Sequence, residues 1–178
     1  SDDLRSFNII PGEESHQFLT GVQSGDVPPE KWLIRAEIDP ERRRFIFFGG
    51  NSFPTWEDGD YRDETYEMEL DSYEWEEVSA STSPSARGQY AAAWDPVEKH
   101  YYIMGGLYRV GAAIENVITY NEVWVYDSGT QTWHQELPAP PRPLPRRNPT
   151  AVFDPVIRRI IMFGGEMIRA VSEVQTVV

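Results

Sequence analysis

The stretch Asp154-Pro155-Val156-Ile157-Arg158-Arg159-Ile160-Ile161-Met162-Phe163-Gly164-Gly165 decides the fold, because its pattern occurs three times in the chain. An Asp-Pro pair leads into an apolar run that ends in Gly-Gly. The other two copies begin at Asp39 and Asp95, and in every copy the first Gly follows the Asp by 10 residues. Successive copies lie 56 and 59 residues apart. A fixed internal period of this size indicates a repeat architecture of the propeller type.

Each repeat is predicted to form a four-stranded antiparallel meander. The Asp-Pro pair makes the first turn, because Asp bonds its own backbone and Pro presets φ. In the second copy the expected strands are 89–94, 100–104, 122–126 and 132–136. In the first copy, residues 66–70 alternate apolar and acidic side chains, which is typical of a half-buried strand.

Glycines and aromatic residues mark the structural positions of each repeat. Glycine at the end of the second strand allows positive φ or the close approach of a neighbouring backbone. Tyr66 and Trp75 lie nine residues apart, as do Trp124 and Trp133, which aligns the third and fourth strands of two copies. The predicted structural residues are Gly49, Gly50, Tyr66, Trp75, Gly105, Gly106, Trp124, Trp133, Gly164 and Gly165.

The pattern resembles the kelch repeat, in which Gly-Gly closes an apolar run and is followed by an aromatic residue and a Trp, with Pro and Arg before the next run. The resemblance covers residues 33–178 and implies an all-β fold of kelch-type β-propeller blades. Two and a half repeats do not close a ring, since a propeller usually has about 4–8 blades. We therefore expect an incomplete ring, either part of a longer chain or completed by another chain.

The repeats divide the chain into four parts. Residues 1–32 are an N-terminal extension or the remnant of a preceding blade, 33–78 form kelch repeat 1, and 79–137 form kelch repeat 2. Residues 138–178 form kelch repeat 3, which is incomplete because a fourth strand is absent after the segment 172–177.

Composition narrows the classes of partner. The formal net charge of −13 disfavours nucleic acid, because phosphate binding needs clustered Lys and Arg. No apolar run approaches the roughly 18 residues of a membrane span, so we expect no membrane insertion. Residues 57–77 hold 11 acidic side chains and one basic one, Arg62, which indicates a solvated acidic face or a docking patch for a basic partner. The absence of Cys fits a reducing compartment, and we expect a cytoplasmic or nuclear location.

No residues form a pattern that carries chemistry. The three histidines, His16, His100 and His134, have no second His or carboxylate at motif spacing. The acidic residues within 57–63 offer oxygens for Ca²⁺, but their spacing does not match an EF-hand loop. We therefore predict no catalytic residue, no metal and no cofactor.

One end of the blades is the predicted binding face. In a meander, the loop between strands 2 and 3 and the linker from strand 4 to the next blade emerge together, and here both are long. Binding residues concentrate in long loops on a rigid scaffold, and Trp, Tyr and Arg are the usual anchors. The resemblance adds the Arg before each first strand, which lines this face in kelch propellers. The candidate partner-binding residues are Trp56, Tyr61, Arg87, Tyr108, Arg109 and Arg146.

The sequence favours a non-catalytic protein–protein interaction scaffold that uses these loops. Two alternatives stay open. One is part of a kelch-propeller enzyme, sugar-acting or metal-dependent, whose active site lies partly outside this chain. The other is a structural subunit of a large assembly, in which a neighbouring chain supplies the closing strand by β-augmentation.

Overall fold

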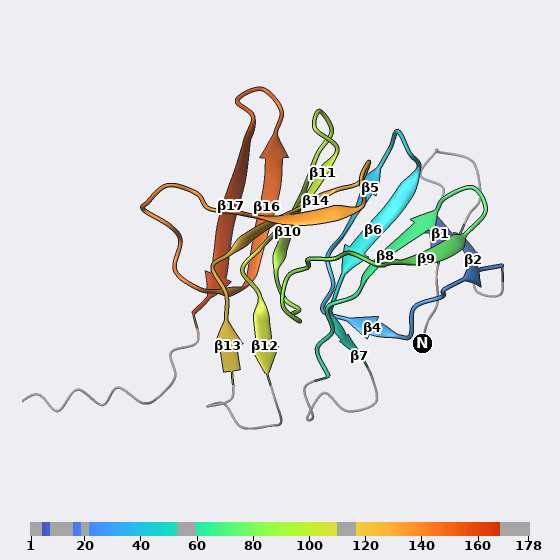
Figure 1. Cartoon of the computed structure of the whole chain (residues 1–178), viewed down its shortest axis with the longest axis horizontal. Coiled ribbons are helices and arrows are strands. Elements are labelled where there is room, and N and C mark those ends of the chain that lie inside the picture. Colours follow the sequence, from blue (N-terminus) through green and yellow to red (C-terminus); the bar gives the residue numbers. More distant parts are fainter. Residues whose placement is uncertain (1–4, 8–15, 19–21, 53–59, 110–116, 168–178) are drawn as a thin grey trace, which may run out of the picture.

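Three β-sheets stand side by side in sequence order in the computed structural model of this chain (Figure 1). The structure describes residues 5–7, 16–18, 22–52, 60–109 and 117–167. β-strands are the only regular elements within those ranges, and no helix there is long and apolar enough to cross a membrane.

The first two sheets are four-stranded antiparallel meanders, which confirms the predicted blade. Blade 1 runs β5 (Ala36–Asp39), β6 (Arg44–Phe48), β8 (Thr65–Glu69) and β9 (Glu74–Val78). Blade 2 runs β10 (Ala91–Asp95), β11 (His100–Met104), β14 (Val123–Asp127) and β15 (Thr132–Glu136). β11 and β15 have the predicted bounds, whereas β10 and β14 begin one or two residues later than predicted.

Blade 3 is described over two strands, β16 (Arg147–Asp154) and β17 (Arg159–Glu166), which pair antiparallel. The segment 172–177, which we predict to be its third strand, lies outside the described residues. The described chain therefore forms an open array of blades and no closed ring.

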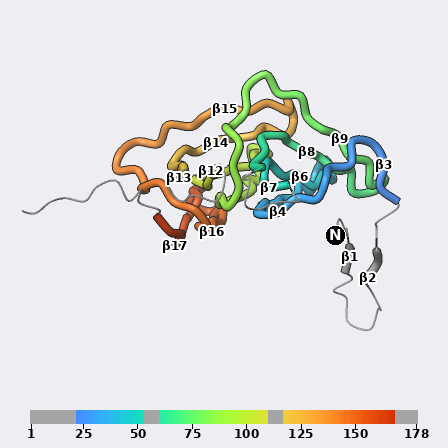
Figure 2. The backbone as a smooth tube through the Cα atoms, turned by 90° about the horizontal axis from the view of Figure 1, so that it is seen from below, coloured from blue at the N-terminus to red at the C-terminus, as the bar shows by residue number. Residues whose placement is uncertain are grey.

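Shorter strands appear where the sequence predicted only loops or an extension. β3 (Ser24–Gly25) adds to blade 1 as a fifth strand parallel to β9, and lies at its outer edge in Figure 2. The remaining strands form three hairpin-like pairs: β1 (Arg5–Phe7) with β2 (His16–Phe18), β4 (Lys31–Trp32) with β7 (Asn51–Ser52), and β12 (Leu107–Arg109) with β13 (Val117–Thr119). Segments of two or three residues are too short for an alternating pattern to reveal.

The Asp-Pro turn is built alike in all three blades. The Oδ1 atoms of Asp39, Asp95 and Asp154 each accept hydrogen bonds from the backbone N–H groups two and three residues later, at 2.8–3.3 Å. The carboxylate thereby satisfies the two N–H groups that the turn leaves without a strand partner.

The Gly-Gly pairs connect each blade to the next. The Gly50 N–H donates to the Arg87 carbonyl at 2.9 Å, and the Gly106 N–H donates to the Arg146 carbonyl at the same distance. Gly105 has a φ of 69°, and a Cβ built there would lie 2.8 Å from the Arg146 carbonyl oxygen. Positive φ and close backbone approach together explain why glycine stands at this position.

Blade 2 packs on blade 1 through aromatic rings whose polar ends are all satisfied. Tyr90, Tyr101, Tyr126 and Trp133 join Ile46 and Phe48 in one buried cluster. The tyrosine hydroxyls and the indole N–H each donate across the interface: Tyr90 to the Phe48 carbonyl at 2.6 Å, Tyr101 to the Arg35 carbonyl at 2.6 Å, Tyr126 to Glu67 Oε1 at 2.7 Å, and Trp133 to Thr65 Oγ1 at 2.9 Å.

The acidic face of β8 is not solvated, contrary to the alternating pattern that predicted a half-buried strand. Glu67 is fully buried, because blade 2 stacks on the face from which it points. The Arg42 guanidinium donates to both of its carboxylate oxygens at 3.1 Å, in addition to the bond from Tyr126. A buried carboxylate held by a cation and a hydroxyl is compatible with burial in a way that a lone charge is not.

Replacing Gly105 by Ala should destabilise the chain. The strained φ and the clash with the Arg146 carbonyl should lower the free energy of unfolding by about 1–3 kcal/mol, measured by chemical denaturation. Gly164→Ala is the matched control, because Gly164 has a φ of 72° but no atom within 4 Å of the position that a Cβ would occupy. Equal losses in the two variants would show that the inter-blade contact has no role.

Candidate protein-interaction face

The short strands between the main strands project from one end of the blades. β4, β7, β12 and β13 extend below the sheets in Figure 1, while the Asp-Pro turns lie at the opposite end. The loops between second and third strands, which carry β7 and β12, therefore share an end with the segment that enters each first strand.

Two tyrosines from neighbouring blades meet at this end. Tyr61 belongs to the loop of blade 1 and Tyr108 to β12 of blade 2, and their ring centroids lie 6.0 Å apart. Gly88 lies between Tyr61 and Leu33, since a Cβ at Gly88 would be 3.2 Å from both side chains. Burial raises the pKa of the Tyr61 phenol, and Arg109 and Arg147 partly oppose that shift. The phenol is therefore neutral near pH 7 and able to donate a hydrogen bond.

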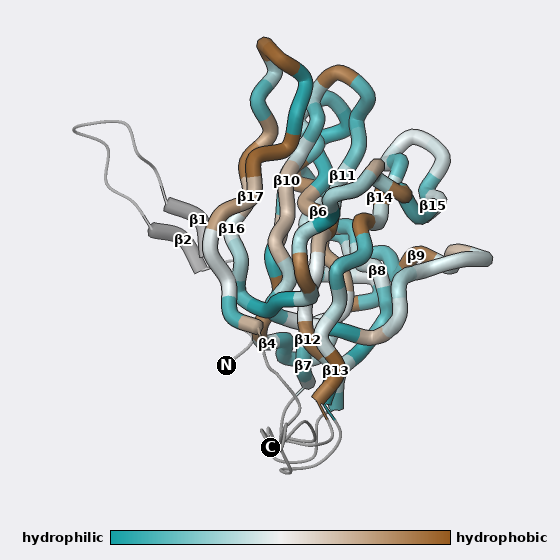
Figure 3. Tube along the Cα trace, turned by 90° about the vertical axis from the view of Figure 1, so that its left-hand side faces the viewer, coloured by the Kyte–Doolittle hydropathy of each residue, from teal (hydrophilic) through white to brown (hydrophobic). Residues whose placement is uncertain are grey.

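Exposed apolar side chains border the tyrosine pair. Ile118 pairs directly with Tyr108 across the β12–β13 hairpin and is 52% exposed. Trp32, in β4, is 54% exposed, and the next residue, Leu33, is also exposed. The brown tip of β13 in Figure 3 belongs to the same stripe. We call Trp32, Leu33, Tyr61, Tyr108 and Ile118 the loop face.

Arg87 lies beneath this face rather than on it. Its side chain is fully buried, where Nη2 donates to Glu122 Oε2 at 2.7 Å and the guanidinium lies 3.8 Å from the centroid of the Tyr120 ring. Burial lowers the pKa of the guanidinium, and the Glu122 carboxylate opposes that effect. This burial corrects the expectation that Arg87 contacts a partner, because a neighbouring blade covers it; its role is to hold the loops of blade 2.

A second buried cation occupies the equivalent position of blade 1. Lys31 precedes Gly49 by 18 residues, as Arg87 precedes Gly105. Its Nζ donates to Glu64 Oε2 at 3.2 Å, and burial lowers the pKa of its ammonium group. The sequence prediction missed Lys31 by assigning it to the extension 1–32, although the 18-residue spacing could have identified it.

Arg146 repeats part of the Arg87 arrangement in a more open setting. Its Nε donates to the Leu144 carbonyl at 3.0 Å and its Nη1 to the Gly164 carbonyl at 2.8 Å. The side chain is half-buried and borders the groove between blades 2 and 3. Of the other candidates, Arg109 lies on β12 close enough to Tyr61 to affect its pKa, and Trp56 lies outside the described residues.

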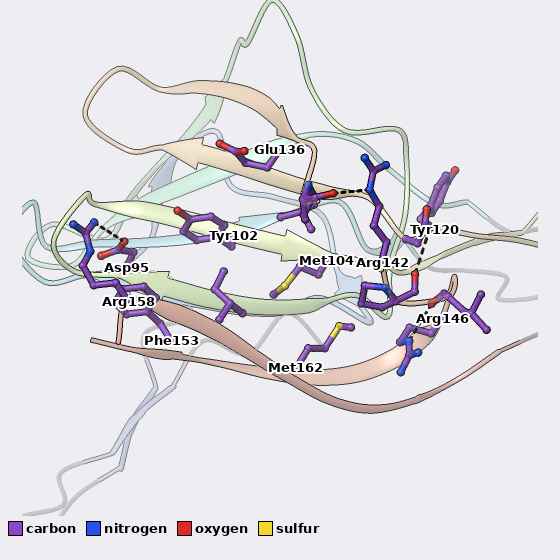
Figure 4. A pocket seen from close by; sticks show the side chains of 17 residues that line it. Asp95, Tyr102, Met104, Tyr120, Glu136, Arg142, Arg146, Phe153, Arg158 and Met162 are labelled. Atoms are coloured by element: carbon purple, nitrogen blue, oxygen red, sulfur yellow. Dashed lines mark hydrogen bonds and ion pairs between the residues drawn. The ribbon is translucent and has the colours of Figure 1, made fainter. Parts of the chain in front are cut away.

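A groove of about 660 Å³ separates blade 2 from blade 3 (Figure 4). Its floor is apolar and comes from β11, β14, β16 and β17. Charged side chains border it, including Arg158, whose Nη2 lies 3.8 Å from Asp95 Oδ2. The apolar floor residues are Met104, Val123, Phe153, Ile160 and Met162. No group of three or more His, Asp or Glu suited to a metal ion occurs in the part of the chain that the structure describes.

Removal of the buried cation should cost stability, whereas removal of its open counterpart should not. Arg87→Met leaves Glu122 without its charge partner and should lower the free energy of unfolding by about 2–4 kcal/mol. Arg146→Met, the matched control, should cost about 0.5–1 kcal/mol, since it loses hydrogen bonds to carbonyls alone. Urea denaturation of the two variants measures the difference, and similar values would contradict the structural role of Arg87.

Comparisons with known proteins agree with the repeat pattern. A family model described as the KLHDC2/KLHL20/DRC7 Kelch-repeats domain matches residues 2–176. The dynein alpha chain of the flagellar outer arm from Chlamydomonas reinhardtii is 30% identical over 127 residues. The aligned region covers 68% of this chain and 2% of that dynein chain, so the chain spans a small fraction of this curated relative.

Proposed function

Because the chain belongs to the kelch-repeat family, we propose that it is a non-catalytic interaction module that binds a protein partner through the loop face. Kelch repeats generally mediate protein–protein interaction. Which surface serves this purpose in the present chain is the specific content of the proposal.

The observation that carries the proposal is the tyrosine pair with its apolar border. Tyr61 and Tyr108 hold each other in place across two blades, so little side-chain freedom is lost when a partner binds them. Tyrosine and tryptophan are enriched among residues that dominate binding energy. Trp32 and Ile118 place more than half of their surface in solvent beside the pair. An exposed apolar stripe bordered by polar groups is typical of a protein contact site.

Charge favours a basic partner. The chain carries a net charge of −13, and Glu74, Glu76 and Glu77 are exposed along β9 of blade 1. A field of one sign accelerates the encounter with an oppositely charged protein and makes the association rate sensitive to salt. We propose that this acidic edge attracts the partner and that the loop face holds it.

Substitution on the loop face should weaken the partner without unfolding the chain. With the partner isolated from the native source, Tyr108→Ala and Ile118→Asp should each raise Kd at least ten-fold in calorimetry. Val156→Asp is the control, because Val156 is an equally apolar side chain, 88% exposed, at the opposite end of the blades. An unchanged Kd in both loop-face variants, or an equal loss in the control, would reject the assigned face.

A second role, as part of a large assembly, is favoured by the outer side of blade 3. Ile161 and Phe163 point away from blade 2 and are 50% and 79% exposed. Their equivalents in blade 1, Ile46 and Phe48, are fully buried by the next blade. We propose that a further blade, from a longer chain or a neighbouring one, covers this side, as similarity to a dynein chain suggests. Phe163→Asp should then block incorporation into the native assembly and leave the loop-face Kd unchanged.

A further inference from the structure

The groove between blades 2 and 3 has a filled counterpart between blades 1 and 2. The strand registers define the equivalence: Phe48 pairs with Thr65 in blade 1, and Met104 pairs with Val123 in blade 2. Met104 and Val123 line the groove. Their counterparts Phe48 and Thr65 lie at a fully packed interface.

The third and fourth strands of blade 2 fill that counterpart. The Trp133 ring lies 5.3 Å from Phe48 and 5.1 Å from Tyr126, measured between ring centroids. Both aromatic side chains are buried, and they come from adjacent strands of one hairpin, β14–β15. The space next to blade 1 is thus occupied by two rings that a single hairpin presents on one side.

The corresponding strands are not part of the described blade 3. In the described chain β17 pairs with β16 alone, and its inward side chains Ile160 and Met162 face the groove in Figure 4. Ile160 stands where Tyr101 stands in blade 2, and the Tyr101 ring lies 6.0 Å from Trp133. Met104 and Ile160 are therefore the two walls between which a large side chain would insert.

We propose that this groove receives a β-hairpin from another polypeptide, which pairs with the open edge of β17 and inserts two large apolar side chains over Met104 and Val123. Strand addition supplies backbone hydrogen bonds, and the inserted side chains supply specificity. A pocket of this size and apolar lining matches two side chains of the Phe or Leu class. The site is independent of the loop face, so either proposal can fail without the other.

The floor of the groove sets the chemistry of the inserted side chains. In blade 1 the central strand offers Glu67 as the acceptor for the Tyr126 hydroxyl. Register places Val125 at the Glu67 position in blade 2, and valine accepts no hydrogen bond. A hydroxyl buried there would lose its partner, which is costly. The polar groups of this side lie on the outer strand, where His134 and Glu136 are exposed. The occupant should therefore carry Phe or an aliphatic residue over the central strand, rather than Tyr.

The test uses a hairpin of known fit as the probe. A synthetic peptide with the sequence of residues 121–137 is titrated into the full chain, alongside the same peptide carrying Tyr126→Phe and one carrying Trp133→Ala. Saturable binding is expected, at least five-fold tighter for the Tyr126→Phe peptide and at least ten-fold weaker for the Trp133→Ala peptide. Amide hydrogen exchange should slow in β17 when the probe binds, because its edge gains strand hydrogen bonds.

Variants of the chain complete the experiment. Ile160→Asp should abolish probe binding, whereas Ile118→Asp on the loop face should leave it unchanged; circular dichroism verifies that both variants are folded. Absence of saturable binding, a preference for the Tyr-bearing peptide, or equal binding by Ile160→Asp would overturn the proposal. A dimer of the chain alone that the probe dissociates would assign the groove to a second copy, and would overturn it as well.

Discussion

The backbone contact between one Gly-Gly pair and the next blade determines the spacing of the whole array. The Gly50 N–H donates to the Arg87 carbonyl, and the Arg87 N–H donates to the Arg62 carbonyl of the preceding loop. These bonds fasten the start of blade 2 to the end of β6, at a distance that admits no Cβ at Gly49. The aromatic packing further along the blades depends on that distance, because rings fill the inter-blade space only when the sheets are set at the right separation.

Polar groups inside the interface then decide which blade fits which. Tyr90, Tyr101, Tyr126 and Trp133 bury large surfaces, but each also carries a donor that would be costly without an acceptor. Blade 1 supplies those acceptors from its backbone and from Thr65 and Glu67. Blades of one repeat family are therefore not interchangeable, since each interface matches a particular set of donors and acceptors.

The sequence predicted the blades well because their signals are local. The Asp-Pro turn, the apolar run and Gly-Gly follow one another within a dozen residues, and β11 and β15 lie where they were predicted. What the sequence did not reveal depends on contacts between blades. Glu67 was read as a solvated residue, and Arg87 as an accessible one, because nothing local to either shows that another blade covers it. Tyr61 and Tyr108 were singled out separately, and the structure brings them together.

The fifth strand of blade 1 has a consequence for how copies of this chain behave toward one another. β3 covers the outer edge of β9, and the aromatic cluster of Phe47, Tyr66 and Trp75 on the side away from blade 2 is already buried. Blade 3, by contrast, leaves Phe163 exposed. The array is thus polar, closed at its first end and open at its last. Head-to-tail growth of identical copies into a filament needs complementary surfaces at both ends. The closed first end removes one of the two surfaces, which protects the chain from open-ended self-association.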